Sequence, residues 1–210
     1  MELEIRRPKL HELEKAIEVF YLAFKGEFRY IFGKYLEYGK KLLINFYKKI
    51  IKRQDLDNFL IAKSNNKIVG AVNLDFSHLK FLKFLSYFIK LNMHFLRAHT
   101  VLGFRRTIRI TMAMYWFFIE NFRARSCYIN LFAVLPKYQK RGIGTKMLQK
   151  IEKLTKRRNL DSMTLDVAFS DAPARYLYEK MGFTEVNRVQ NSVLKHLNAI
   201  EGFMSMEKKL

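Results

Sequence analysis

The chain has 210 residues, 50% of them hydrophobic, and a formal net charge of +20. This length and apolar content can bury one substantial core, so we expect a single domain over residues 1–210 and exclude a disordered chain. The apolar run Ile110–Ile119 is too short to span a bilayer, and the first residues lack the apolar stretch of a signal peptide. The single cysteine, Cys127, excludes an internal disulfide, and this favours a reducing, cytoplasmic location. We expect its side chain to be buried.

The excess of positive charge is compatible with a nucleic-acid or a membrane partner. The lysines are nevertheless spread over many segments, and no arginine-rich arm occurs. A solvated surface together with an anionic cofactor explains the charge equally well, so we expect no nucleic-acid partner. A peripheral membrane contact and a homodimer are left open.

The first third of the chain predicts a strand, two amphipathic helices and a hairpin. Alternation predicts the strand, which Pro8 ends. Helical spacing of apolar residues predicts the two helices, and the turn formers Ser64-Asn65-Asn66 predict the hairpin. The expected elements are a strand at 3–7, helices at 11–24 and 34–52, and hairpin strands at 58–63 and 68–74.

Residues 79–125 form a segment that looks helical and carries nine Lys or Arg but one acid, Glu120. Three interpretations remain open for this insertion. It covers the sheet with its lysines extending to water, it covers the acceptor pocket of an active site, or it lies on an anionic membrane.

A basic, glycine-containing turn follows the apolar strand 127–135, which ends before Pro136. Lys140 and Arg141 precede Gly142 and Gly144, and an amphipathic helix begins there. The first amides of a helix are unpaired and carry the positive end of its dipole, so they favour a phosphate group. Glycine removes the side chains that would hold a pyrophosphate away.

The turn is neither a P-loop nor a dinucleotide fingerprint, because it lacks a closing Gly-Lys-[Ser/Thr] and a third glycine. Beyond it the pattern predicts a strand, a helix and two more strands. These expected elements are a strand at 163–169, a helix after Asp171, and strands at 183–189 and 202–208.

Two motifs resemble those of the GNAT superfamily of N-acetyltransferases. Gln139-x-x-Gly142-x-Gly144 after the strand resembles motif A, and the helix with Leu177-Tyr178 before Gly182-Phe183 resembles motif B. The resemblance implies an α+β fold. In this GNAT fold a mixed central β-sheet is splayed at the CoA site and flanked by helices, here with a helical insertion before the motif A strand.

The resemblance also implies acetyl-CoA as a co-substrate. The histidines show no metal-ligand spacing, so we expect no metal. The cofactor would be bound by residues of the motif A strand and turn and of the motif B helix. By resemblance these residues are Phe132, Ala133, Val134, Gln139, Lys140, Arg141, Gly142, Ile143, Gly144, Thr145, Asp171, Ala174 and Tyr178.

The resemblance implies that Tyr178 is the general acid that protonates the departing thiolate. An ordinary tyrosine, with a pKa near ~10, is protonated at neutral pH and can donate. The alternative is a core tyrosine packed beneath the cofactor. Tyr176 lies two positions away and points to another face of the helix.

The general base is not fixed by the sequence. Where many relatives carry a carboxylate, the motif A strand offers only Asn130, which could orient a water. Asp171 stands where the family often has asparagine, so its cofactor contact stays open. The other candidate bases are Glu27, Asp75, His78 and Asp166.

Two functions of different class therefore remain, and a nucleic-acid-binding role driven by charge is a weaker third. The first is transfer of an acetyl group from acetyl-CoA to a primary amine of a small molecule or peptide, by direct attack in a ternary complex. The second is a non-catalytic CoA- or acyl-CoA-binding protein on the same fold.

Overall fold

The computed structural model describes residues 2–50, 53–76, 103–104, 107, 125–190 and 202–210. The expected insertion at 79–125 therefore lies almost entirely outside the described residues, as does His78. Among the helices of the described part, none is long and apolar enough to cross a membrane.

Seven strands form one mixed sheet in the order β1-β2-β3-β4-β5-β7-β6. Neighbouring strands are antiparallel except β4 and β5, which are parallel. The strands are β1 (Leu3–Arg6), β2 (Phe59–Ser64), β3 (Lys67–Asp75), β4 (Ser126–Val134), β5 (Ser162–Ala168), β6 (Thr184–Gln190) and β7 (Gly202–Lys209).

The predicted hairpin is confirmed as β2 and β3. Asn65 and Asn66 form its two-residue turn with φ of +47° and +63°, values that asparagine tolerates better than most residues. The strands predicted around the two motifs are confirmed as well. The mixed sheet flanked by helices is the α+β architecture expected from the sequence.

The helices are α1 (Leu13–Ala23), α2 (Lys25–Phe32), α3 (Leu36–Ile50), α6 (Ile143–Arg157) and α7 (Ala172–Lys180). The sequence pattern predicts no helix or strand for residues 25–33, whereas the structure has α2 there. It forms because Phe28 contacts the rings of Tyr21 and Phe32 at centroid distances of 5.5 and 5.8 Å. Gly33, with φ of +54°, ends it.

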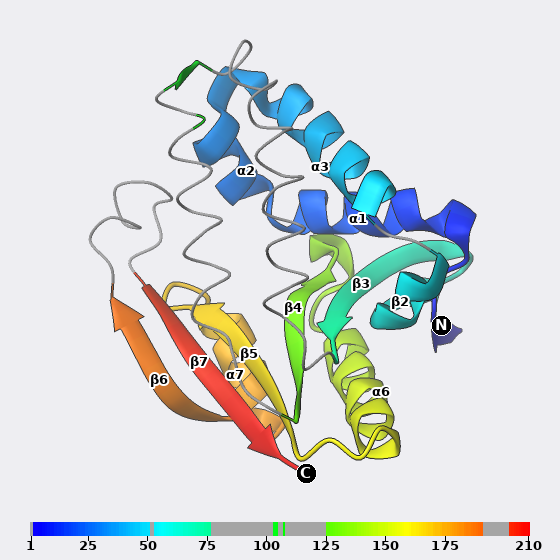
Figure 1. Cartoon of the computed structure of the whole chain (residues 1–210), viewed down its shortest axis with the longest axis vertical. Coiled ribbons are helices and arrows are strands. Elements are labelled where there is room, and N and C mark those ends of the chain that lie inside the picture. Colours follow the sequence, from blue (N-terminus) through cyan, green and yellow to red (C-terminus); the bar gives the residue numbers. More distant parts are fainter. Residues whose placement is uncertain (1, 51–52, 77–102, 105–106, 108–124, 191–201) are drawn as a thin grey trace.

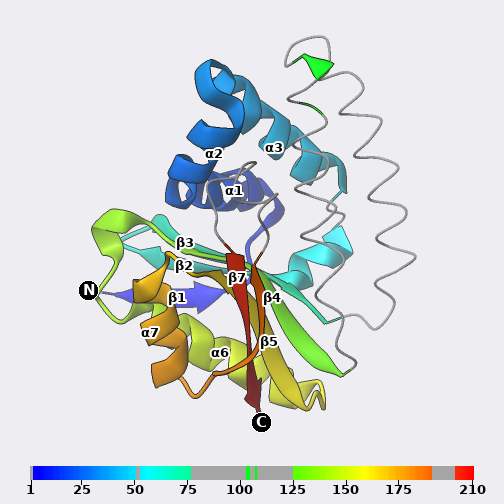
Figure 2. The same cartoon turned by 90° about the vertical axis from the view of Figure 1, so that its left-hand side faces the viewer.

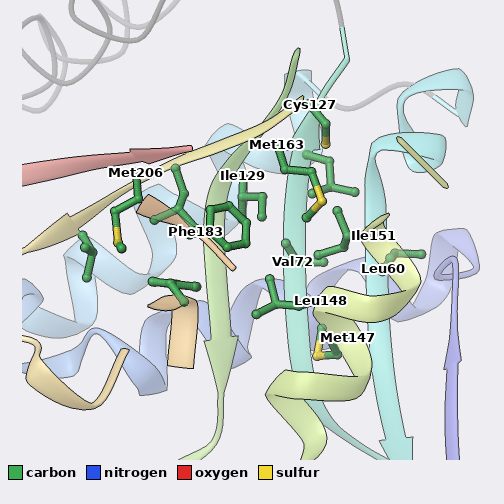
Figure 3. Packing of buried hydrophobic residues seen from close by; sticks show 14 of the residues in the cluster. Leu60, Val72, Cys127, Ile129, Met147, Leu148, Ile151, Met163, Phe183 and Met206 are labelled. Carbon is green, nitrogen blue, oxygen red and sulfur yellow. The ribbon is translucent and has the colours of Figure 1, made fainter. Parts of the chain in front are cut away.

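The helices lie on both faces of the sheet. Figure 2 shows α1, α2 and α3 above the sheet and α6 and α7 below it. Leu148 and Ile151 of α6 are fully buried with Val72 and Met163 of the strands (Figure 3). Cys127 belongs to the same core with 0% exposure, so its expected burial is confirmed.

The sheet opens between its two parallel strands. β4 and β5 pair over four positions, from Ser126↔Ser162 to Ile129↔Leu165. β5 continues to Ala168 with β7 alone as its partner, and Figure 1 shows β4 and β5 diverging beyond their paired ends. The parts of both strands beyond these pairs leave a wedge, which is the splay expected from the sequence.

Candidate functional site

The turn after β4 is tied to the sheet at its start. The amide of Leu135 donates to the Val69 carbonyl at 2.8 Å, and the side-chain Nε2 of Gln139 donates to the Val134 carbonyl at 3.0 Å. Lys140 and Gly142 then take φ of +58° and +76°. These left-handed residues reverse the chain so that α6 begins directly beneath the end of β4.

The first turn of α6 has features that favour an anion. The residue that precedes it, Gly142, provides no capping side chain, and the first turn contains no acid. A Cβ built on Gly142 would meet nothing within 4 Å, so the space beside this residue is open. By contrast, α7 begins with Asp171, whose carboxylate accepts from the Ala174 amide at 3.1 Å. The start of α7 is thus capped from within the chain, whereas α6 has no side-chain cap.

The basic residues of the turn lie at its surface. Lys140 and Arg141 are exposed, and the guanidinium of Arg141 lies 5.6 Å from the Tyr138 ring centroid. Thr145 is half-buried, whereas Ile143 is only 1% exposed and belongs to the core. Of the predicted cofactor residues, Ile143 can therefore offer only its backbone.

Gly144 has a packing role as well as its place in the turn. A Cβ at this position would lie 3.0 Å from Cδ2 of Leu177 and 3.7 Å from the Phe132 ring. The glycine thus lets α6 approach α7 at Leu177, whereas the distance to Phe132 would be an ordinary van der Waals contact. The two motifs that are some thirty residues apart in the sequence form one site.

Tyr178 lies at the centre of this junction. Its side chain is buried, and its ring lies 6.3 Å from that of Phe132 and 5.8 Å from that of Phe183. Burial, and secondarily the Asp171 carboxylate, raises the pKa of Tyr178 above its ordinary value. Tyr176 is 68% exposed, as its place on another face of the helix predicts.

The backbone N–H and C=O groups of β4 point alternately toward β3 and toward the opposite edge. Because Leu135 donates to β3, alternation directs the backbone groups of Val134 and Phe132 toward the wedge and those of Ala133 toward β3. The wedge side of β4 therefore presents the amides of Phe132 and Val134. Ala133 is the less suitable of the predicted backbone contacts.

Asn130 occupies a β-bulge at the mouth of the wedge. Asn73 pairs with Leu131 while the next residue of β3 pairs with Ile129, so Asn130 is the extra residue. Its Nδ2 donates to Oδ1 of Asn73 at 3.2 Å. The bulge marks the position where β4 turns away from β5.

Asp166 is a second polar centre, one position beyond the last pair of β4 and β5. Its carboxylate accepts hydrogen bonds from the Tyr128 hydroxyl at 2.7 Å and the Ser205 hydroxyl at 2.6 Å. Burial, and then the nearby Asp166 charge, raises the pKa of Tyr128 well above its ordinary value. Sequence reasoning named Asp166 as one of several bases but missed Tyr128 and Ser205. The sequence contains no local signal for this arrangement, because it depends on the registers of β4 with β5 and of β5 with β7.

Of the other candidate bases, Asp75 lies near this centre, because its charge also contributes to the raised pKa of Tyr128. Asp75 stands opposite Tyr128 in the β3–β4 register. Glu27 belongs to α2, but its side chain lies outside the described residues. Within the described part of the chain, no group of three His, Cys, Asp or Glu side chains could hold a metal ion.

Comparison with known proteins gives a family match to most of the chain. Residues 20–183 match the acetyltransferase (GNAT) family. An N-alpha-acetyltransferase of Sulfurisphaera tokodaii is 43% identical over 68 residues, covering 32% of this chain and 38% of that protein. A [ribosomal protein bS18]-alanine N-acetyltransferase of Haemophilus influenzae is 41% identical over 59 residues, covering 28% of this chain and 40% of that protein. The match thus spans well under two thirds of either relative.

A solved structure supports the same fold over the full length. The PaiA N-acetyltransferase of Thermoplasma acidophilum, determined in complex with coenzyme A, superposes with a TM-score of 0.60 at 18% identity. The alignment covers 100% of both chains. At this identity the likeness shows the fold alone.

Proposed function

This chain belongs to the acetyltransferase (GNAT) family, and we propose that it transfers an acetyl group from acetyl-CoA to the amino terminus of a peptide or protein. The observation that carries the proposal is the meeting of three features at one opening of the sheet. They are a helix start without a side-chain cap, an edge of β4 without a strand partner among the described residues, and a buried tyrosine. Each matches one need of acyl transfer from a diphosphate-containing thioester.

The residues present suit such a coenzyme. The amides at the start of α6, with Lys140 and Arg141 beside them, would hold the pyrophosphate. The wedge edge of β4 would take the pantetheine arm as an added strand. Bound acetyl-CoA would supply the activated acetyl carbon as a thioester.

The thioester oxygen gains negative charge when the amine attacks and needs a fixed donor. The amides of Phe132 and Val134 face the wedge and form no ladder with β5, so we assign this role to them. The amine nitrogen bonds to the acetyl carbon, the carbon–sulfur bond breaks, and the nitrogen loses its extra proton to solvent, so that an amide and a thiolate form.

Tyr178 gives its proton to that thiolate. A pKa above the ordinary tyrosine value keeps the hydroxyl protonated across neutral pH, so the acid is present whenever the thiolate forms. Solvent then returns the proton to the phenolate.

The ammonium form of the acceptor must lose a proton before it can attack. We assign this step to Asp166, which lies on the wedge portion of β5 and is held by Tyr128 and Ser205. Leu165 and Val167 face the core that contains Tyr178, so alternation places Asp166 on the opposite face. The acceptor amine would thus lose its proton to Asp166 on one face of the sheet. The thiolate would receive a proton from Tyr178 on the other face.

Two observations bear on the acceptor. The matched relatives are named for acetylation of an alpha-amine and of a ribosomal protein's alanine, which favours a peptide amino terminus. The Asp166 carboxylate, which accepts from two hydroxyls at the opening, suits an ammonium group.

The test is thiol release from acetyl-CoA with three matched acceptors: an octapeptide with a free amino terminus, the same peptide with a blocked amino terminus and small amines. The proposal predicts turnover with the free peptide and none with the blocked one. Turnover confined to small amines would show that the acceptor is a small-molecule amine and not a peptide amino terminus. Coenzyme binding without turnover of any amine would favour a non-catalytic binding protein.

A further inference from the structure

Helix α6 carries a row of cations on its exposed face. Lys146, Lys150, Lys153 and Arg157 recur at spacings of four, three and four residues and are all exposed. At 100° per residue the four lie within an arc of about 60°, and at 1.5 Å per residue the row is about 16 Å long. We call these four residues the α6 row.

The α6 row has no neutralising partner among the ion pairs that the structure gives. The single acid of the helix, Glu152, is already bound to Lys156 at 3.0 Å and Lys208 at 2.7 Å. The row is therefore an uncompensated line of positive charge. Although the lysines are dispersed along the sequence, folding gathers these four on one surface.

The surface suits a phosphate backbone better than a lipid bilayer. Membrane-bound helices insert an apolar face, but the apolar face of α6 is fully used in the core, with Met147, Leu148 and Ile151 at 0% exposure. None of the large exposed hydrophobic side chains of the described residues lies on α6. What remains for a partner is charge alone.

The geometry points to duplex RNA as the partner. The inner face of α6 is packed on the sheet, so only its outer face, which carries the α6 row, can meet a nucleic acid. The narrow major groove of A-form RNA presents close phosphate rows that a surface row of lysines can contact without entry. The described part of α6 also exposes no aromatic ring on which single-stranded bases could stack. We propose that the α6 row binds the phosphate backbone of duplex RNA.

The experiment measures binding of a 20-base-pair RNA by fluorescence anisotropy at several salt concentrations. The variant K150Q/K153Q/R157Q removes three cations that lie away from the proposed coenzyme turn, and glutamine keeps the helix propensity. The matched control K15Q/K41Q/K67Q removes three exposed lysines from α1, α3 and β3.

We expect the row variant to bind at least about tenfold more weakly than the wild type, with the salt slope reduced by about three, whereas the control keeps near-wild-type affinity. Thiol release with peptide acceptors should be unchanged in both variants, which separates this inference from the proposed enzymatic function. Equal loss in both variants would overturn the inference. So would equal affinity for DNA of the same sequence, or binding to anionic vesicles with none to RNA.

Discussion

Gly144 on α6 and Leu177 on α7 approach so closely that a Cβ on the glycine would lie 3.0 Å from the leucine Cδ2. This contact joins α6, which follows the glycine-containing turn, to α7, which carries Tyr178. The positions of the coenzyme turn and of the proposed acid are therefore linked through packing.

The first prediction concerns this contact. In Gly144→Ala the added methyl group crowds Leu177, and this cost should outweigh alanine's higher helix propensity, so the free energy of unfolding should fall by up to about 1 kcal/mol. In the Leu177→Ala background the same substitution should cost much less, since the crowded atom is gone. Urea unfolding of the single and double variants measures the coupling, and additive effects would contradict the packing role.

The second prediction separates backbone conformation from ligand space at Gly142. Gly142→Asn should keep most of the stability, because asparagine tolerates the φ of +76°, but it should weaken coenzyme binding by filling the open space. Gly142→Ala adds strain of about 1 kcal/mol. Calorimetry and thermal unfolding compare the two, and wild-type coenzyme affinity in the asparagine variant would count against a ligand in that space.

The third prediction concerns the proposed acid. Tyr178→Phe keeps the ring between Phe132 and Phe183, so coenzyme affinity and folding should be near wild type. Thiol release should fall about 10²–10⁴-fold, the usual contribution of a general acid. Tyr176→Phe, at a 68% exposed position, is the control and should retain full activity. Similar activity in the two variants would remove Tyr178 from the mechanism.

The fourth prediction concerns the proposed base. Asp166→Asn should reduce thiol release by about 10²-fold or more without loss of coenzyme affinity. Tyr128→Phe should cause a smaller loss, because this hydroxyl acts by positioning the carboxylate. Asp161→Asn is the control, since Asp161 is exposed and pairs with Arg125. Equal activity of the Asp166 and Asp161 variants would contradict the assignment.

The fifth prediction concerns stability against pH. Glu12 is 7% exposed and accepts from both terminal nitrogens of Arg6 at 2.7 and 2.8 Å, and this holds the pKa of its carboxyl well below the ordinary 4.5. Its stabilisation is present above pH 4.5 and is lost as the pH falls from there toward the depressed folded pKa.

Glu12→Gln should therefore lower the free energy of unfolding by about 2 kcal/mol at pH 7, with the difference from wild type narrowing below pH 4.5. Urea unfolding at pH values from roughly 3 to 7, the range in which the linkage is expected, provides the measurement. Glu14→Gln, at a half-exposed ion pair with Lys48, is the control and should change little. A constant difference across the range would contradict the linkage.

Local signals were sufficient where structure depends on neighbouring residues. The Asn65-Asn66 turn, the strand before Pro136 and the glycine turn at 142–144 are specified by conformational preference, and the structure has each of them. Helix α2 was missed because its formation depends on contacts of Phe28 with Tyr21 and Phe32 rather than on a capping signal.

The surroundings of Asp166 could not be predicted because they depend on the register of three strands. Ser205 stands directly opposite Asp166 in the antiparallel β5–β7 pair, and Tyr128 is opposite Thr164 in the parallel β4–β5 pair. The diagonal contact of Tyr128 with Asp166 arises only when both registers are fixed. The contact between Gly144 and Leu177 could not be predicted either, because it depends on how two helices pack against each other.

The central claim is that backbone amides at the start of α6 bind the pyrophosphate of coenzyme A. Isothermal titration of the wild-type protein with coenzyme A and with pantetheine, which lacks the pyrophosphate and the nucleotide, tests it most directly. We predict that coenzyme A binds at least about tenfold more tightly, as charge-assisted contacts at a helix start require. Equal affinities for the two ligands, or no heat with coenzyme A, would contradict the claim.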